Sequence, residues 1–125
     1  MPAPAAIVTR PLRIGPIALD VPVVLAPMAG VTDAPFRSLC RRYGAGLYVS
    51  EMVMARAVIG RGRRTMRMIE FAPDETPRSI QLYGTEPVSL GEAVRTLVGE
   101  GRVDHIDMNF GCPAPKVTRN GGGSA

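Results

Sequence analysis

Cysteine is scarce in this chain, which has only Cys40 and Cys112 among its 125 residues. Small secreted domains usually carry more cysteines, so we expect two free thiols and a reducing, cytoplasmic environment. Long apolar runs are also missing, whereas a membrane span needs about 18 consecutive apolar residues or more. The first residues contain no continuous apolar segment followed by a cleavage pattern. The sequence therefore predicts neither a secretory signal nor a membrane partner.

Histidine and lysine are nearly absent too, since His105 and Lys116 are the only ones. No pairing of cysteine with histidine has the spacing of a metal site, and Asp104 and Asp107 do not form a metal-binding cluster. We therefore expect no metal. His105 comes two residues before Asp107 in the same predicted strand, so both side chains lie on one face and His105 lies deeper in the sheet. This position favours a structural role.

Arginine supplies fourteen of the fifteen basic residues, and the formal net charge is +4. Five arginines gather within twelve residues, namely Arg56, Arg61, Arg63, Arg64 and Arg67. This density is typical of a surface that faces phosphates, although plain solubility explains a modest positive charge equally well. Few aromatic residues are interleaved there, so the segment does not indicate a platform for stacking bases.

Four short apolar runs, each bounded by glycine, proline or aspartate, predict β-strands because β-branched and aromatic residues are frequent in them. Their ranges are 21–26, 46–49, 79–83 and 103–109. Residues 12–19 resemble one more short strand. With Asp20 as its turn, we expect it to form an N-terminal β-hairpin that leads into the first run.

Helical patterns separate the predicted strands. Thr32 is expected to cap the first helix, and residues 54–69 predict two short helices broken by Gly60 and Gly62. The last helix opens at 85–87 and closes near Gly99 or Gly101. The apolar face of the first helix consists of Phe36, Leu39, Cys40 and Tyr43. That of the last helix consists of Leu90, Ala93, Val94, Leu97 and Val98.

The alternation of strands and helices predicts an α/β fold with a parallel sheet. The strands end near residues 27, 51, 82 and 110, at intervals of 24 to 31 residues. A (β/α)8 barrel repeats at about this interval and needs about 250 residues in all. We therefore expect residues 1–125 to be the N-terminal half of a (β/α)8 TIM barrel, with about four parallel strands and an N-terminal β-hairpin. A complete four-stranded α/β domain is the alternative.

Polar and small side chains follow three of the predicted strands, at the edge where parallel sheets bind ligands. The segment 27–30, Pro-Met-Ala-Gly, lets a flat ligand approach the backbone. Gln81 can both donate and accept a hydrogen bond, as the edge of a pyrimidine-like ring requires, and Asn109 ends the fourth strand. One such amide alone is more often a core residue, but together with Met28 they favour a site. Glu51 fits either a site or a helix-start carboxylate.

The two cysteines have different settings. Cys40 lies on the apolar face of a predicted helix, which indicates packing. Cys112 lies between Gly111 and Pro113 in a loop after a strand, at the mouth of any barrel and beside Asn109. An ordinary cysteine is mostly protonated at neutral pH, so it can donate a proton as well as attack.

Three segments resemble the tRNA-dihydrouridine synthase family: LAPMAGVTDAPFRSLCRRYGAGLYVSEM (25–52), IQLYGTEP (80–87) and DMNFGCPAPKVTRNGGGSA (107–125). The APMAGVTDxPFR and NxGCPxxKV patterns are specific, and the similarity runs from about residue 12 to residue 125, closest to the bacterial type. The resemblance implies a flavoprotein with a (β/α)8 catalytic barrel. It would bind FMN, take hydride from NADPH and reduce specific uridines of tRNA to 5,6-dihydrouridine.

The family chemistry also implies roles for single residues. Hydride would pass from flavin N5 to C6 of uracil, and Cys112 would protonate C5. The target base would be flipped out of the RNA, as enzymes that act on bases commonly require. The cofactor-binding residues that the resemblance implies are Pro27, Met28, Ala29, Gln81 and Asn109.

Other parts of such an enzyme are expected beyond residue 125: the remaining barrel strands, the groups that bind the FMN phosphate and a C-terminal helical tRNA-binding domain. Three alternatives stay open. The chain is part of another FMN-dependent barrel acting on a free pyrimidine or quinone, a non-catalytic RNA-binding module, or an inactive truncated product.

Overall fold

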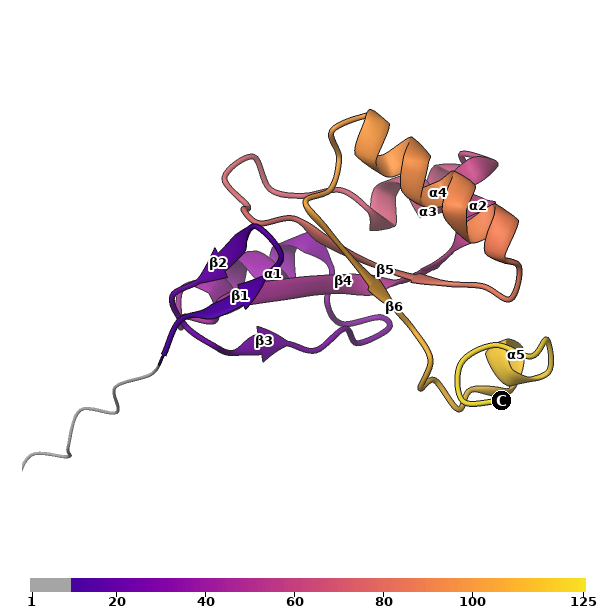
Figure 1. Ribbon diagram of the computed structural model, residues 1–125, viewed down its shortest axis with the longest axis horizontal. Coiled ribbons are helices and arrows are strands. Elements are labelled where there is room, and N and C mark those ends of the chain that lie inside the picture. The colour runs from indigo at the N-terminus through magenta and orange to yellow at the C-terminus, as the bar shows by residue number, and fades with distance from the viewer. Residues whose placement is uncertain (1–9) are drawn as a thin grey trace, which may run out of the picture.

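A four-stranded parallel sheet organises residues 10–125, the part of the chain that this computed structural model describes (Figure 1). Its hydrogen-bonded order is that of the sequence: β3 (Val24–Leu25), β4 (Leu47–Met54), β5 (Ser79–Tyr83) and β6 (His105–Met108). The prediction of an α/β fold with four parallel strands is confirmed, and the topology is that of the N-terminal half of a (β/α)8 barrel. The prediction that the chain has no secretory signal concerns mainly residues 1–9, which lie outside the described residues.

Helices connect the strands as expected. They are α1 (Ala34–Arg41), α2 (Ala55–Ile59), α3 (Arg63–Met68), α4 (Pro87–Gly99) and, after β6, the single turn α5 (Pro115–Thr118). The prediction of two short helices separated at Gly60 and Gly62 is confirmed, and α4 opens at Pro87, where proline fits the first turn. No helix among residues 10–125 combines the length and apolar character needed to cross a membrane.

The N-terminal hairpin lies entirely within residues 12–19. Strand β1 (Leu12–Ile14) pairs antiparallel with β2 (Ile17–Leu19). The chain reverses after β1 at Gly15, whose φ of +56° suits glycine, so Asp20 is not its turn and that detail of the prediction was wrong. Leu19 packs against Leu47 and Val49, and the hairpin thereby covers the start of β4.

Strand β4 is longer than predicted because it continues through the polar residues Ser50 and Glu51. The pairing with β5 changes register between Val49 and Met52, which is the signature of a β-bulge. Ser50 Oγ lies at this irregularity and accepts the backbone N–H of Gln81 at 3.3 Å. The extra residue brings Met52 opposite Gln81.

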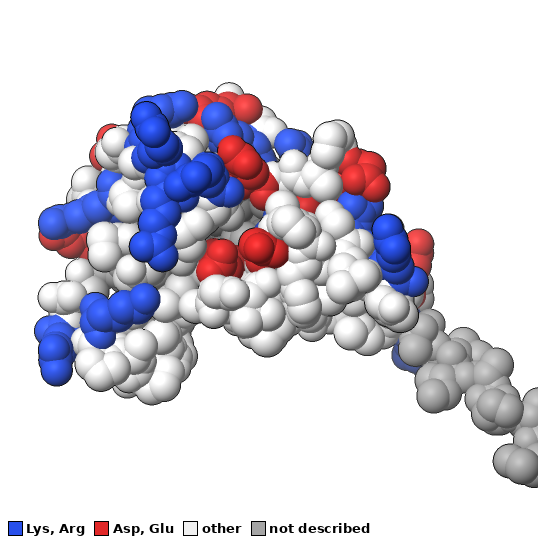
Figure 2. Space-filling model, turned by 180° about the vertical axis from the view of Figure 1, so that it is seen from behind, with Lys and Arg blue, Asp and Glu red and all other residues white. Residues whose placement is uncertain are grey.

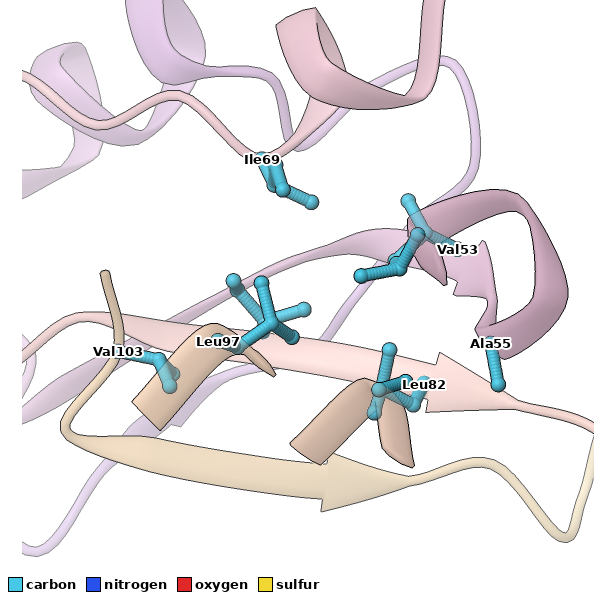
Figure 3. Packing of buried hydrophobic residues seen from close by; sticks show 9 residues of the cluster. Val53, Ala55, Ile69, Leu82, Leu97 and Val103 are labelled. Carbon is cyan, nitrogen blue, oxygen red and sulfur yellow. The ribbon is translucent and has the colours of Figure 1, made fainter. Parts of the chain in front are cut away.

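The main core lies between the sheet and helices α2 to α4, which cover one of its faces (Figures 1 and 3). Val53 and Leu82 come from the strands, Leu97 from α4 and Ile69 from the end of α3. All four are at most 3% exposed. Burial of each such side chain contributes about 1.5 to 3 kcal/mol to folding, so this layer fixes the strands that carry the site.

Helix α1 buries a different face from the one expected. Leu39 and Tyr43 are 48% and 84% exposed, Cys40 is half-buried, and the fully buried residue is Arg37. The N-cap of α1 is Asp33 and not the predicted Thr32, because Asp33 Oδ1 accepts the Phe36 N–H at 2.9 Å. On α4 the predicted face holds for Ala93 and Leu97, but Val98 is 56% exposed.

Candidate active site

A cavity of about 380 Å³ lies at the carboxyl ends of β4, β5 and β6, against the loop that follows β3. Five of the six predicted site residues line it: Pro27, Ala29, Gln81, Asn109 and Cys112. Met52, Met108, Phe110 and Gly111 complete its lining. Met28 does not line it, and its side chain is 38% exposed. The parallel topology therefore brings segments about 80 residues apart in sequence to one edge of the sheet.

The polar side chains of this edge form a chain of hydrogen bonds. Gln81 Nε2 donates to Asp107 Oδ2 at 2.6 Å, and Asn109 Nδ2 donates to Gln81 Oε1 at 3.1 Å. Asn109 Oδ1 in turn accepts the backbone N–H of Cys112 at 2.9 Å and that of Gly111 at 3.2 Å. The two amides are thus held in one orientation by partners on both sides.

The loop that carries Cys112 is also held through its carbonyl group. The Ser124 N–H donates to Cys112 O at 3.1 Å, which folds the glycine-rich end of the described chain back onto the loop. Gly123 adopts a φ of +60° and approaches the same carbonyl. Cys112 is half-buried and not in a disulfide, so its thiol is available to a ligand in the cavity.

The loop after β3, residues 26–33, is held by three contacts. Thr32 Oγ1 accepts the Met28 N–H at 2.9 Å and donates to Met28 O at 3.2 Å. Glu51 Oε1 accepts the N–H of Gly30, whose φ is +74°. Glu51, which the sequence left open, is therefore a strand residue bound to the site loop and not a helix-start carboxylate.

A buried ion pair next to this loop fixes its position. Arg37 Nε donates to Glu75 Oε1 at 2.6 Å, and the side-chain exposures are 0% and 1%. Arg37 Nη1 also donates to Thr32 O at 2.8 Å, and its guanidinium carbon lies 4.9 Å from the ring centroid of Phe71. Arg37 thus links the loop of the site to residues 70–75.

A model of the dihydrouridine synthase family matches residues 24–125. The chain belongs to the dihydrouridine synthase family. It is 59% identical over 121 residues to a probable tRNA-dihydrouridine synthase of Mycobacterium tuberculosis, with 91% of this chain and 31% of that relative covered. It is 50% identical over 115 residues to tRNA-dihydrouridine synthase B of Pseudomonas aeruginosa, with 91% and 34% covered. The chain spans about a third of the length of these curated relatives.

The arginine-rich segment of this family member lies on α2, α3 and the turn between them. Arg56 pairs with Glu86 and Arg61 pairs with Glu100, so two of the five predicted phosphate-facing charges are neutralised locally. The hydrogen bond from Arg56, followed by that from Ser89, holds the pKa of Glu86 below its ordinary value. The hydrogen bonds from Arg61 and Arg102 likewise lower the pKa of Glu100.

The remaining basic residues form an open surface. Arg63, Arg64 and Arg67 are exposed, and none makes an ion pair among residues 10–125. Figure 2 shows basic side chains gathered over the α2–α3 region and again over the segment around α5. Arg64 and Lys116 line a second cavity, of about 520 Å³, which shares Ala29 and Met52 with the first. Positive charge therefore lies next to the candidate site.

The single histidine lies outside the lining of the site. His105 Nδ1 is 2.9 Å from Ser79 Oγ, and the contact joins β6 to β5, as the predicted structural role requires. Within residues 10–125 no group of three or more histidine, cysteine, aspartate or glutamate side chains is arranged to hold a metal ion.

Sequence reasoning missed two contributors to the site, the approach of Gly123 to Cys112 and the buried Arg37. It placed Asp107 on one strand face with Asn109 and left Glu51 open as a site residue, but it did not predict their contacts with Gln81 and Gly30. These contacts join segments distant in sequence, so no local pattern reveals them.

Proposed function

We propose that the chain is the N-terminal part of the catalytic barrel of a tRNA-dihydrouridine synthase. In this proposal the full-length enzyme reduces specific uridines of tRNA to 5,6-dihydrouridine, with FMN as cofactor and NADPH as reductant. The observation that carries it is the meeting of two amides, Gln81 and Asn109, with the Cys112 thiol around one cavity. The similarity to a probable tRNA-dihydrouridine synthase and to tRNA-dihydrouridine synthase B supports the same substrate.

The residues of the cavity fit the ring system of a flavin. Met52 and Met108 offer soft apolar surface, and the backbone of Pro27 and Ala29 adds a wall without bulky side chains. The Gln81 amide has a further N–H beyond the one that it donates to Asp107, which suits a polar ring edge, whereas Asn109 Nδ2 also donates to Met52 Sδ at 3.4 Å. None of the described residues that line this cavity is cationic, so the cofactor phosphate would bind to groups outside it.

FMN, when bound, supplies the hydride that C6 of the uracil accepts. Reduction of the C5–C6 double bond also needs one proton at C5, and Cys112 is the acidic side chain of the cavity. Its S–H bond breaks as the C5–H bond forms, and the resulting thiolate regains a proton from solvent. A neutral thiol can do this without placing a charge beside the base beforehand.

The exposed arginines of α3 and Lys116 would contact phosphates next to the flipped nucleotide. Such contacts position an RNA without reading its sequence, so the choice of uridine would rest on other parts of the enzyme. The two free thiols suit the reducing cytoplasm, where we place the enzyme.

The test uses the full-length protein, unmodified tRNA and NADPH, with the nucleosides of the digested tRNA identified by mass spectrometry. We expect a yellow protein that forms dihydrouridine in tRNA and leaves free uridine unchanged. Reduction of a free pyrimidine without action on tRNA would instead assign the chain to another flavin-dependent barrel. Binding of tRNA by a protein without flavin would indicate a non-catalytic RNA-binding module.

A further inference from the structure

We infer that Asp107 is a positioning residue, whose carboxylate sets the direction of the hydrogen-bond chain that ends at the Cys112 loop. This inference rests on the proposed function. Asp107 does not line the cavity, so it does not touch the reacting atoms. It reaches the site through Gln81, whose Nε2 lies 2.6 Å from Asp107 Oδ2.

The direction of the chain follows from its two ends. The backbone N–H groups of Gly111 and Cys112 can only donate, and a carboxylate can only accept. Between these ends, Asn109 must present its oxygen to Cys112 and its NH2 to Gln81, and Gln81 must present its NH2 to Asp107. Both ends impose the same order, so neither amide can turn over without bringing two donors or two acceptors together.

Removal of the acceptor at position 107 leaves only one end of the chain in place. Gln81 is 8% exposed, so its NH2 group would then lack a partner in a largely buried position. The order is then imposed by the N–H groups of Gly111 and Cys112 alone, so the Gln81 side chain moves to bring its NH2 group to another acceptor or to water. Its Oε1 then no longer holds the NH2 group of Asn109, and the Cys112 loop, which is bound to Asn109 Oδ1, loses its fixed place.

The inference is tested with Asp107→Ala and Asp107→Asn in the full-length protein. The asparagine variant keeps an acceptor oxygen and removes only the charge, so it separates hydrogen bonding from electrostatics. We expect Asp107→Ala to slow the tRNA-dependent reoxidation of the reduced flavin by about 10- to 100-fold, because small misplacements of reacting groups cost that much. Asp107→Asn should stay within about threefold of the wild type, since its hydrogen bond is kept.

Asp104→Ala is the matched control. It removes a carboxylate just before the same strand, where Asp104 Oδ2 accepts the Arg78 N–H at 2.8 Å, away from the cavity. We expect it to react at the wild-type rate. Rates are expressed per flavin-loaded molecule. Asp107→Leu, which keeps the branched shape at Cγ but has no hydrogen-bond acceptor, replaces Asp107→Ala if the latter does not fold.

A second readout needs neither flavin nor turnover. In a Cys40→Ser background, we expect iodoacetamide to alkylate Cys112 of the flavin-free protein at least about threefold faster in Asp107→Ala than in Asp107→Asn. Equal alkylation and reoxidation rates for Asp107→Ala and the wild type would overturn the inference. So would an asparagine variant as impaired as the alanine variant, because charge would then be the active property. A wild-type enzyme that forms no dihydrouridine would refute the proposed function, whereas the alkylation rates would still test the hydrogen-bond chain.

Discussion

A Cβ atom added to Gly123 would stand 2.2 Å from the carbonyl oxygen of Cys112. Glycine is therefore needed at this position for space as well as for its φ of +60°. The contact explains the glycine-rich end of the described chain: residues 121–124 close on the loop that carries the thiol, and Ser124 binds the same carbonyl.

Gly123→Ala should therefore impair catalysis more than Gly121→Ala, its matched control. Gly121 also has a positive φ, of +78°, but an added Cβ would meet nothing closer than 3.9 Å. Both variants bear the backbone strain of about 1 kcal/mol, whereas only Gly123→Ala must move Cys112. We expect at least about a tenfold lower rate of dihydrouridine formation for Gly123→Ala in the full-length enzyme. Equal rates for the two alanine variants would argue against the loop contact.

The buried ion pair between Arg37 of α1 and Glu75 should stabilise the fold much more than the pair between Arg41 of the same helix and Asp74. Arg37→Ala leaves Glu75 buried and uncompensated, and we expect a loss of about 3 to 5 kcal/mol in the free energy of unfolding. Arg41→Ala, the control, breaks a pair with the exposed Asp74 and should cost about 0 to 1 kcal/mol.

Urea denaturation of the full-length protein measures both values. The double variant Arg37→Met with Glu75→Leu should recover much of the loss, because apolar side chains of similar volume remove the unpaired charge. A double variant no more stable than Arg37→Ala would show that the charges themselves hold the loop.

Arg64→Ala should weaken tRNA binding in a salt-dependent way. Each lost phosphate contact lowers the slope of log affinity against log salt concentration by about one. Arg13→Ala, on the exposed strand β1 at the hairpin, is the control and should leave the slope unchanged. Titration of tRNA at several salt concentrations gives the slopes, and an unchanged slope for Arg64→Ala would place the RNA elsewhere.

Residues 1–125 expressed alone should associate and fail to retain FMN. Strands β3 and β6 are the edges of the described sheet, and Val24 on β3 is 43% exposed. Leu39 on α1 and Tyr43, which follows that helix, are 48% and 84% exposed. Open edges and uncovered apolar surface favour aggregation. Size-exclusion chromatography with an absorbance scan tests this, and a yellow 13.3 kDa monomer with stoichiometric FMN would contradict it.

The periodicity of the sequence was enough to predict the parallel sheet and the strand ends, because alternation and helical spacing are local properties. It could not predict which face of α1 is buried. Leu39 and Tyr43 are the apolar choice, yet Arg37 is buried because Glu75, 38 residues away, neutralises it. Strand β4 was predicted too short for a similar reason, since Ser50 is stabilised by its contact with Gln81 on a neighbouring strand.

The sequence was enough to predict the residues of the candidate site, but not the hydrogen bonds between them. Gln81 lies within β5, while Asn109 and Cys112 follow β6, and the order of elements is enough to assign them to the edge of the sheet that binds ligands. Their hydrogen bonds depend on the register of β5 against β6, in which Gln81 lies opposite Asp107. Gln81 and Asp107 are 26 residues apart in sequence, and the register between their strands is set by packing in the folded protein. No local sequence pattern predicts it.

The role of Cys112 is decided by the rate at which the Cys112→Ala variant of the full-length protein forms dihydrouridine. The matched control is Cys40→Ser, which changes the other free thiol on α1. We expect the Cys112→Ala variant to bind FMN and to be reduced by NADPH as the wild type is. It should form dihydrouridine in tRNA about 10² to 10⁴ times more slowly, because the loss of a general acid typically slows a reaction by this factor. Cys40→Ser should form it at the wild-type rate. A Cys112→Ala enzyme that modifies tRNA as fast as the wild type would contradict the assignment of Cys112 as the proton donor.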